Sequence, residues 1–282
     1  MKLREVLAQA VARLTNSDSP KLDAQLLLMK ACSLSRVQLI TKENEPLSEE
    51  QYQLFESLLN QRLAGHPIAH LLGERDFWDL KLKVTPDTLI PRPDTEVLVE
   101  QALEIINKQE GKAKVLDLGT GSGAIILSLK HSAPNIEAVA VDLSPAALQV
   151  ARDNAQSYNL DVSWYLGSWF TALPQELTKD SCFDVIVSNP PYIEEHDEHL
   201  KQGDVRFEPL SALVSGPDGL DDIRFIAQES TKYLRSGGYL LLEHGYNQGA
   251  QVREILSNNG YEQVATIKDY GGNDRVTLGI HI

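Results

Sequence analysis

The architecture of this chain follows from one segment, Val115-Leu116-Asp117-Leu118-Gly119-Thr120-Gly121-Ser122-Gly123-Ala124. Its first four residues predict a buried strand, and a helix is expected to begin at Ala124. Glycines at a strand-to-helix turn let a ligand approach bare backbone at the helix N-terminus. The spacing also satisfies the looser Gly-x-Gly-x-x-Ala form of the dinucleotide fingerprint. The segment therefore predicts a nucleoside-type cofactor, with a plain tight turn as the structural alternative.

Strands and helices alternate around this segment, from residue 94 to the end of the chain. We expect strands at Lys114–Leu118, Ala138–Asp142, Ser163–Leu166, Val185–Ser188, Tyr239–Glu243, Gln263–Lys268 and Val276–His281. We expect helices at Ala124–His131, Pro145–Tyr158, Asp222–Leu234 and Gln248–Asn259. This alternation predicts an α/β fold, a parallel sheet with helices on both faces. The last two strands should pair antiparallel, because the link between them is too short for a crossover helix.

The first third of the chain has helical periodicity instead. Apolar residues recur at helical spacing from Leu3 to Leu14, and a second helix is expected at Leu22–Cys32. Ser48 and Gln51 have the spacing of a capping box, which predicts the start of a third helix. These patterns predict a separate helical domain.

The period changes to that of a strand at Trp78. Trp78, Leu80, Leu82 and Val84 alternate with polar residues, and several prolines follow. We place the domain junction here. The predicted division is a helical domain at 1–75, a β-hairpin linker at 76–93 and an α/β domain at 94–282.

Composition excludes several classes of protein. The chain has 282 residues, 42% hydrophobic and 23% charged, as in soluble globular proteins. No apolar run approaches the ~20 residues that span a bilayer, and Met1–Val6 lacks an apolar signal core. The two cysteines, Cys32 and Cys182, support neither a disulfide framework nor a zinc site. We therefore expect a cytoplasmic protein without membrane contact.

The charge is acidic and unevenly distributed. The net charge is −14, of which −1 belongs to residues 1–90 and −13 to residues 91–282. Nucleic-acid binders usually carry a basic face that neutralises phosphates. The balance therefore opposes a polyanionic partner and is compatible with a cationic ligand or a basic partner.

The strand expected at Ala138–Asp142 ends in an acid 23 positions after Gly119. A carboxylate at this place can accept hydrogen bonds from both ribose hydroxyls of an adenosine, in NAD and S-adenosylmethionine sites alike. Ser144 is the better N-cap of the next helix, with Pro145 at its first position. Asp142 is therefore expected to serve the ligand.

The strand expected at Val185–Ser188 runs into Asn189-Pro190-Pro191-Tyr192. Ligands bind beyond the carboxyl ends of parallel strands, where this tetrapeptide lies. Consecutive prolines fix the backbone and remove two donors, so the Pro190 carbonyl can act as a rigid acceptor beside the Asn189 side-chain carbonyl. Two acceptors can hold both hydrogens of an –NH₂ group while the Tyr192 ring covers its planar face. The tetrapeptide predicts an amino-methyltransferase, with a structural Pro-Pro turn as the alternative.

These motifs together resemble the class I S-adenosylmethionine-dependent methyltransferases, and among them the PrmC/HemK family, which methylates a glutamine N5 of peptide chain release factors. The resemblance covers nearly the whole chain. It extends to the segments Leu89–Glu96, Val205–Pro209 with Ala212-Leu213, Leu242–Gly245 with Gln248, Asp269–Gly271 and Asp274–Val276. The related branch that acts on a ribosomal protein is not expected to carry the Pro-Asp-Thr-Glu sequence at 93–96.

The resemblance implies the fold, reaction and site. It implies a Rossmann-like class I methyltransferase domain behind a small N-terminal helical domain. We hypothesise that residues 1–75 dock the substrate, because they form a separate helical unit that the strand near 77–84 can hold against the catalytic domain. S-adenosylmethionine, converted to S-adenosylhomocysteine, would be bound by Gly119, Thr120, Gly121, Ser122, Gly123, Asp142, Trp169 and Asn189. Asn189, Pro190, Pro191 and Tyr192 would hold the substrate glutamine, with Asn189, Pro190 and Tyr192 as the catalytic residues. The family often has Asp before this tryptophan, where the present chain has Ser168.

The resemblance also implies the partner, a class I release factor whose Gly-Gly-Gln loop carries the target glutamine. A monomer without a metal or direct nucleic-acid contact is expected. His196 and His199 lie in an acidic sequence that is interpreted as a solvated loop. The alternative functions are an adenine-N6 methyltransferase acting on nucleic acid, a non-catalytic cofactor-binding module and a nicotinamide dehydrogenase.

Overall fold

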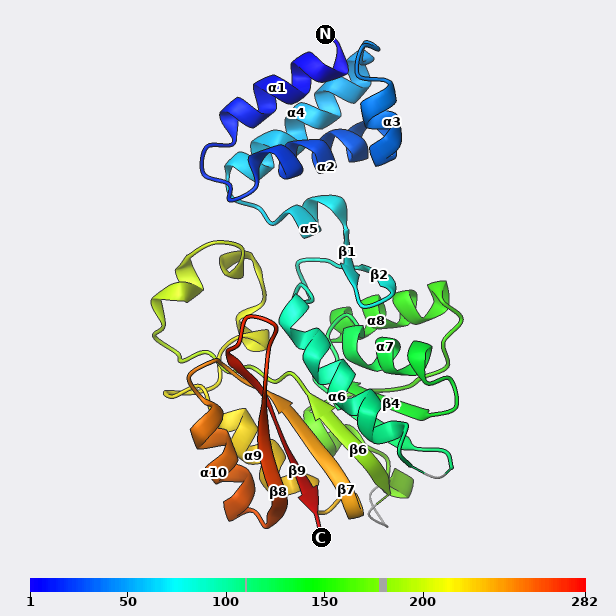
Figure 1. The fold of residues 1–282 in the computed structure, drawn as a ribbon, viewed down its shortest axis with the longest axis vertical. Helices are drawn as coiled ribbons and strands as arrows, with labels where there is room; N and C mark the ends of the chain where they lie inside the picture. The colour runs from blue at the N-terminus through cyan, green and yellow to red at the C-terminus, as the bar shows by residue number, and fades with distance from the viewer. Residues whose placement is uncertain (110, 178–181) are drawn as a thin grey trace. The chain divides into compact units, whose positions relative to one another are not determined.

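The computed structural model describes residues 1–109, 111–177 and 182–282. The chain divides into two compact units (Figure 1). The first consists of Met1–Glu74 together with Lys201–Phe207, and the second of Arg75–Leu200 together with Glu208–Ile282. No helix among the described residues is long and apolar enough to cross a bilayer.

The first unit is helical. Its helices are α1 (Leu3–Arg13), α2 (Pro20–Cys32), α3 (Arg36–Thr41), α4 (Glu49–Leu63) and α5 (Ile68–Leu72). The predicted capping box of α4 is confirmed, since Ser48 Oγ accepts from the Gln51 amide at 3.2 Å and Gln51 Oε1 from the Ser48 amide at 3.0 Å. The sequence did not predict α3 and α5, because helices of six and five residues are too short to display a periodic apolar stripe.

Residues 201–207 complete this helical unit although they lie far along the chain. Arg62 pairs with Asp23 at 2.8 Å and with Asp204 at 3.5 Å. The Phe207 ring lies 4.4 Å from the His66 ring, centroid to centroid. The helical unit therefore includes a short segment that follows the Asn189–Tyr192 tetrapeptide in sequence.

The second unit is built on a seven-stranded sheet. Its strands are β3 (Lys114–Leu118), β4 (Glu137–Asp142), β5 (Ser163–Leu166), β6 (Phe183–Ser188), β7 (Leu234–Glu243), β8 (Tyr261–Lys268) and β9 (Asp274–His281), in the order β5-β4-β3-β6-β7-β9-β8. Strands β3 to β7 pair in parallel, and β9 runs antiparallel to both of its neighbours. The predicted parallel sheet and antiparallel final pair are confirmed.

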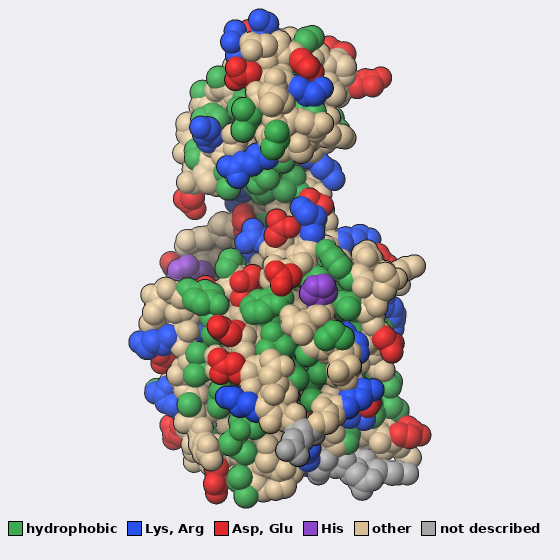
Figure 2. All heavy atoms as spheres, turned by 45° about the vertical axis from the view of Figure 1, so that its right-hand side comes forward, with side chains coloured by type: hydrophobic (Ala, Val, Ile, Leu, Met, Phe, Trp, Pro, Cys, Tyr) green, Lys and Arg blue, Asp and Glu red, His purple; other side chains and the backbone are tan. Residues whose placement is uncertain are grey.

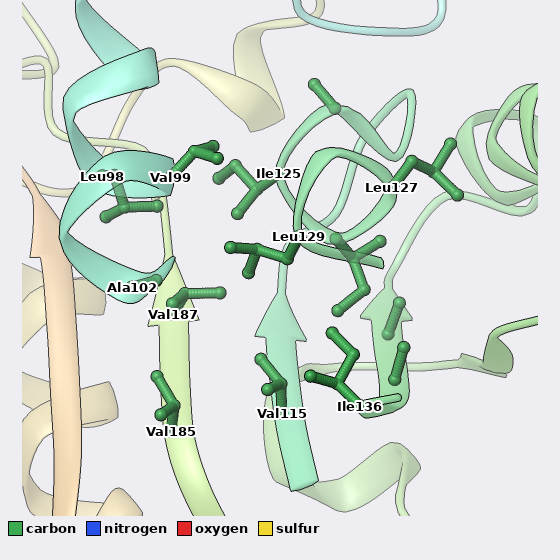
Figure 3. Packing of buried hydrophobic residues seen from close by; sticks show 14 of the residues in the cluster. Leu98, Val99, Ala102, Val115, Ile125, Leu127, Leu129, Ile136, Val185 and Val187 are labelled. Atoms are coloured by element: carbon green, nitrogen blue, oxygen red, sulfur yellow. The ribbon is translucent and has the colours of Figure 1, made fainter. Parts of the chain in front are cut away.

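Helices cover both faces of this sheet (Figure 1). One face carries α6 (Glu96–Ile106), α7 (Ala124–Ser132) and α8 (Pro145–Ser157), and the other α9 (Asp221–Ser230) and α10 (Gly249–Asn258). Figure 3 shows Leu98 and Ala102 of α6 and Leu129 of α7 directed toward Val115 and Val187 of the sheet. The central strands are apolar on both faces, as sheets covered on both sides require.

Two local predictions were wrong. Helix α9 ends at Ser230 rather than Leu234, because Leu234 is fully buried as the first residue of β7 and pairs with Phe183. Trp78 lies in the turn of a hairpin, with φ of 54°, rather than in a strand. That hairpin joins β1 (Glu74–Phe77) to β2 (Leu80–Lys83), and its Leu80 and Leu82 are buried as the alternation predicted.

Helix α6 was not predicted either. Short 3₁₀ segments in the described ranges are η1 (Pro93–Thr95), η2 (Trp169–Ala172), η3 (Gln175–Leu177), η4 (Glu198–Lys201), η5 (Val205–Phe207) and η6 (Leu210–Ala212). Of these, η1 leads directly into α6, and η2 follows β5 at the carboxyl edge of the sheet.

Candidate active site

The carboxyl ends of β3 and β6 lie side by side at the point where the strand order reverses. The chain proceeds from β3 to β4 and β5 on one side, and β6 and β7 lie on the other. Leu118 is in register with Ser188, and Ser188 Oγ donates to the Leu118 carbonyl at 2.7 Å. The loop that starts at Gly119 and the tetrapeptide that starts at Asn189 therefore leave the sheet together, where open α/β sheets bind ligands.

A pocket of about 640 Å³ lies at this edge. Six of the predicted site residues line it, namely Gly119, Gly121, Asp142, Trp169, Asn189 and Pro191, and Ser168 lies beside them in the same lining. The segment Pro86–Leu89 forms another part of the lining. Three carboxyl groups, those of Asp87, Asp142 and Asp222, also belong to it, which suits a cationic ligand.

The glycine loop presents backbone to the pocket. Gly119 and Gly121 have positive φ of 72° and 58°. The amides of Gly119 and Thr120 both donate to the Val141 carbonyl, at 2.9 and 3.0 Å, which anchors the loop on β4. A Cβ at Gly119 would lie 3.3 Å from the Trp169 ring. Because glycine has no Cβ, the Trp169 ring and the backbone of the loop can lie close together.

The other loop residues named in the sequence face inward. Thr120 and Ser122 are buried, and Thr120 Oγ1 donates to Asp117 Oδ2 at 2.6 Å. Gly123 is the N-cap of α7 and has φ of 84°. Asp117 is fully buried, and burial raises the pKa of its carboxyl to about 7. These residues support the loop from behind, and the sequence did not assign Asp117 a role.

Asp142 forms the junction between the loop and β4. Its Oδ2 accepts from the Gly121 amide at 2.7 Å and its Oδ1 from the Ser144 amide at 2.8 Å. Burial raises the pKa of this carboxyl, and the two amide bonds oppose that rise. Ser144 caps α8 by accepting from the Ala147 amide at 3.1 Å, as predicted. The carboxylate is therefore held in the pocket wall by backbone groups and keeps lone pairs that can accept from a ligand.

Trp169 lines the pocket beside the glycine loop, with its ring next to Gly119. It has an uncommon positive φ of 45° at the start of η2. The next residue, Phe170, is buried and stacks on Tyr233 with ring centroids 4.4 Å apart, which anchors the turn. The exposed Ser168 belongs to the same wall.

The tetrapeptide is divided between the pocket and the protein interior. Asn189 and Pro191 line the pocket, whereas Pro190 is buried, and neither Pro190 nor Tyr192 is among the described lining residues. Asn189 Nδ2 donates to Thr95 Oγ1 at 3.3 Å, so its Oδ1 lies on the opposite branch of the amide. The Tyr192 hydroxyl donates to Glu243 Oε1 at 3.3 Å, and Gln248 Nε2 donates to its carbonyl at 3.0 Å.

Glu243 is a functional candidate that the sequence analysis included in the segment Leu242–Gly245 without assigning it a role. It is 1% exposed at the end of β7, and burial raises the pKa of its carboxyl to about 7. Thr95 lies near this carboxyl group and lowers its pKa, and Glu243 Oε2 has no hydrogen-bond partner among the described residues. Burial beside Glu243 also raises the pKa of the Tyr192 phenol. Asn189 and Tyr192 thus both reach Glu243, one through Thr95.

The remaining segments singled out in the sequence surround this group. Arg92 Nη2 donates to the buried Glu208 at 2.6 Å, and the same carboxylate accepts from the Ile90 amide at 3.0 Å. Arg275 pairs with Asp269 at 3.1 Å and with Asp94 at 3.4 Å. Distant parts of the sequence therefore meet around the tetrapeptide.

The residues present fit a nucleoside cofactor with a positive charge. Backbone at Gly119 and Gly121, a carboxylate at Asp142 and an aromatic wall at Trp169 all face one pocket. The described ranges contain no group of three or more His, Cys, Asp or Glu side chains able to hold a metal ion.

Two family models match the chain. Residues 5–73 match the PrmC N-terminal domain, and residues 109–277 match a methyltransferase domain. The release factor glutamine methyltransferase of Escherichia coli K12 is 48% identical over 280 residues, which cover 99% of each chain. The protein of the same name from Vibrio cholerae is 50% identical over 266 residues, covering 94% of this chain and 91% of that protein.

A solved structure supports the fold. A methyltransferase from Pyrococcus furiosus superposes with a TM-score of 0.53 at 19% identity, covering 80% of this chain and 96% of that one. At this identity the likeness concerns the fold alone.

Proposed function

We propose that this chain, which belongs to the release factor glutamine methyltransferase family, transfers a methyl group from S-adenosylmethionine to the side-chain amide nitrogen of a glutamine in a peptide chain release factor. Full-length similarity to enzymes of that name supports the reaction. The observation that carries the proposal at the level of the site is the shared pocket, in which a glycine loop and Asn189 lie at adjacent strand ends.

The residues of the chain have defined tasks in this reaction. The Gly119–Gly123 loop and Asp142 bind the nucleoside, with Trp169 beside the adenine. S-adenosylmethionine supplies an electrophilic methyl group when bound. An amide nitrogen is a poor nucleophile because its lone pair is delocalised, so the protein must hold the amide in line with the methyl donor.

The tetrapeptide binds the glutamine amide through acceptors. Asn189 Oδ1 and the Pro190 carbonyl accept from the –NH₂ group, and Pro191 and Tyr192 shape its surroundings. These bonds strengthen as positive charge develops on nitrogen, so they stabilise the transition state more than the ground state. The cationic product loses its proton to water, and no general base is required before transfer.

The substrate is assigned as the Gly-Gly-Gln loop of a class I release factor. Glycines beside the target permit the close backbone approach that a narrow pocket requires. We assign substrate docking to residues 1–75, the linker role to residues 76–93 and catalysis to residues 94–282. The enzyme acts as a monomer in the cytoplasm.

The nucleic-acid alternative is disfavoured by charge. Residues 91–282 carry a net charge of −13. Acidic and basic side chains are interspersed on the face of the molecule that Figure 2 shows. Proteins that bind a polyanionic substrate usually do so in a continuous basic groove.

Mass spectrometry tests the proposal directly. Purified release factor is incubated with this protein and S-adenosylmethionine, then digested and sequenced by mass. A gain of one methyl group on the glutamine of the Gly-Gly-Gln loop is expected. An unmodified release factor, or methylation of adenine in added nucleic acid, would contradict the proposal.

A further inference from the structure

Asn154 on α8 is buried next to the pocket without lining it. It is 2% exposed, and its side-chain amide makes three hydrogen bonds. Its Oδ1 accepts from the Lys83 amide at 2.7 Å. Its Nδ2 donates to the Lys83 carbonyl at 3.1 Å and to the Ser122 carbonyl at 2.9 Å. One side chain thus binds the main chain at two places that are 39 residues apart in sequence.

Both of these places support walls of the pocket. Ser122 belongs to the glycine loop between Gly121, which lines the pocket, and Gly123, the N-cap of α7. Lys83 ends β2, and Pro86–Leu89, which lines the pocket, begins three residues later. The intervening turn is internally bonded, since the Thr85 amide and carbonyl both contact Thr88 Oγ1, at 3.3 and 3.1 Å. A displacement at Lys83 is therefore passed on to Pro86–Leu89.

A neighbouring residue makes a similar contact that does not reach the loop. Tyr158, one helical turn after Asn154, accepts from the Lys81 amide at 2.7 Å and donates to the Lys81 carbonyl at 3.1 Å through its hydroxyl. Asn154 and Tyr158 thus act together as a substitute pairing partner for β2. Of the two, Asn154 alone donates to the glycine loop within the described part of the chain.

We propose that Asn154 is a positioning residue that fixes two walls of the cofactor pocket relative to each other, the glycine loop at Ser122 and the segment that follows Lys83. The chemistry requires an amide, because the site combines one N–H donor with two carbonyl acceptors. An aspartate of the same shape would present oxygen to both carbonyls. This inference rests on the proposed use of the pocket for S-adenosylmethionine.

The test measures S-adenosylmethionine binding by calorimetry for wild type, Asn154→Ala, Asn154→Asp and the control Tyr158→Phe. We expect the dissociation constant to rise about tenfold in Asn154→Ala and further in Asn154→Asp, since buried carbonyl groups lose their donor. Tyr158→Phe should change it less than twofold although it also releases β2. Thermal unfolding of each variant distinguishes a change in affinity from a change in stability. A purely structural role would lower Tm in both Asn154→Ala and Tyr158→Phe and leave the two variants with similar dissociation constants.

Hydrogen exchange on the wild-type protein gives a second readout that needs no variant. The Lys83 amide donates to Asn154, and the Lys81 amide donates to Tyr158. Adding S-adenosylmethionine should slow hydrogen exchange at the Lys83 amide about tenfold more than at the Lys81 amide. Equal changes at the two amides, or affinities of Asn154→Ala and Tyr158→Phe within twofold of each other, would overturn the inference. Neither measurement uses release factor, so an enzyme that binds S-adenosylmethionine but leaves release factor unmodified would refute the proposed function alone.

Discussion

The two sides of the pocket are held by different kinds of interaction. On the cofactor side, backbone amides fix the loop: those of Gly119 and Thr120 donate to the Val141 carbonyl, and that of Gly121 donates to the Asp142 carboxylate. On the substrate side, side chains from distant segments hold the tetrapeptide: Thr95 contacts Asn189, and Glu243 contacts Tyr192.

The difference shows what each side tolerates. A loop fixed by its own backbone depends on φ angles that only glycine adopts without cost, and less on side-chain chemistry. A tetrapeptide fixed by buried polar side chains depends on their hydrogen bonds and, at Glu243, on protonation. Polar substitutions on the substrate side should therefore affect catalysis. On the cofactor side, glycine substitutions should affect the fold and cofactor binding, and Asp142 and Asn154 are the polar side chains that hold the loop.

The largest effect is expected for Asn189→Ala. Loss of one positioned acceptor should lower the single-turnover rate of methyl transfer by roughly 10²-fold or more, by analogy with deletions in oxyanion holes. The fold should persist, because Asn189 is only half-buried and its side chain makes a single long hydrogen bond, to Thr95, among the described residues. Single-turnover kinetics with release factor, checked by circular dichroism, would measure this. A folded variant that keeps most of the rate would contradict the role of Asn189.

Gly123→Ala should be the most damaging change on the cofactor side. Its φ of 84° is left-handed, and a Cβ would lie 2.8 Å from Leu127 Cδ1 at the start of α7. We expect a loss of about 2–4 kcal/mol in the free energy of unfolding, from φ strain and overpacking together. Gly272→Ala is the matched control, because its φ of 85° is similar and a Cβ there meets nothing within 4 Å. Equal losses in urea unfolding would show that the close contact has no cost.

Asp142→Ala tests the carboxylate that we expect to bind the ribose on the cofactor side of the pocket. Removal of its carboxylate should weaken S-adenosylmethionine binding by about 1–3 kcal/mol, since charge-assisted bonds to the ribose are lost. Calorimetry at constant pH measures the change. Unchanged affinity would mean that the carboxylate serves only the Gly121 and Ser144 amides.

Glu243→Gln should have the smallest effect at neutral pH and the most distinctive pH dependence. The Glu243 pKa of about 7 lies above the ordinary value of a carboxyl group, so the folded protein binds a proton that the unfolded chain releases. Wild type should therefore gain stability relative to the variant as pH falls from about 7 toward 4. Its activity should fall over the upper part of the same range, because protonation weakens the acceptor that Glu243 offers to the Tyr192 hydroxyl.

Three other charged or titratable groups face Glu243, and none of them changes its charge between pH 6 and 8. Arg275 stays cationic and favours the carboxylate, Asp94 opposes it, and burial keeps the Tyr192 phenol neutral. Glu243→Gln should lose both trends, with a several-fold lower kcat at pH 8, consistent with about 1 kcal/mol for one hydrogen bond. Thermal unfolding and kcat measured between pH 6 and 8 provide the check. Stability and activity that vary in the same direction with pH would contradict it.

The sequence by itself determined the elements whose causes are local. The apolar run at Val115–Leu118, the glycines after it and the Ser48–Gln51 capping box encode their structures within a few residues. Periodicity, left-handed φ and fixed proline geometry act over that range, so a single sequence displays them. The same patterns indicated the parallel sheet and brought Gly119 and Asn189 to one edge.

Only the tertiary structure decided which distant side chains support that edge. Asn189 meets Thr95 across 94 positions, Ile90 meets Glu208 across 118, and Asn154 meets Lys83 across 71. These contacts join residues that no local period relates, because their geometry depends on how helices and strands pack. The sequence therefore identified the segments around Thr95, Glu208 and Glu243 as features of a family, and the packing gave each of them a physical task.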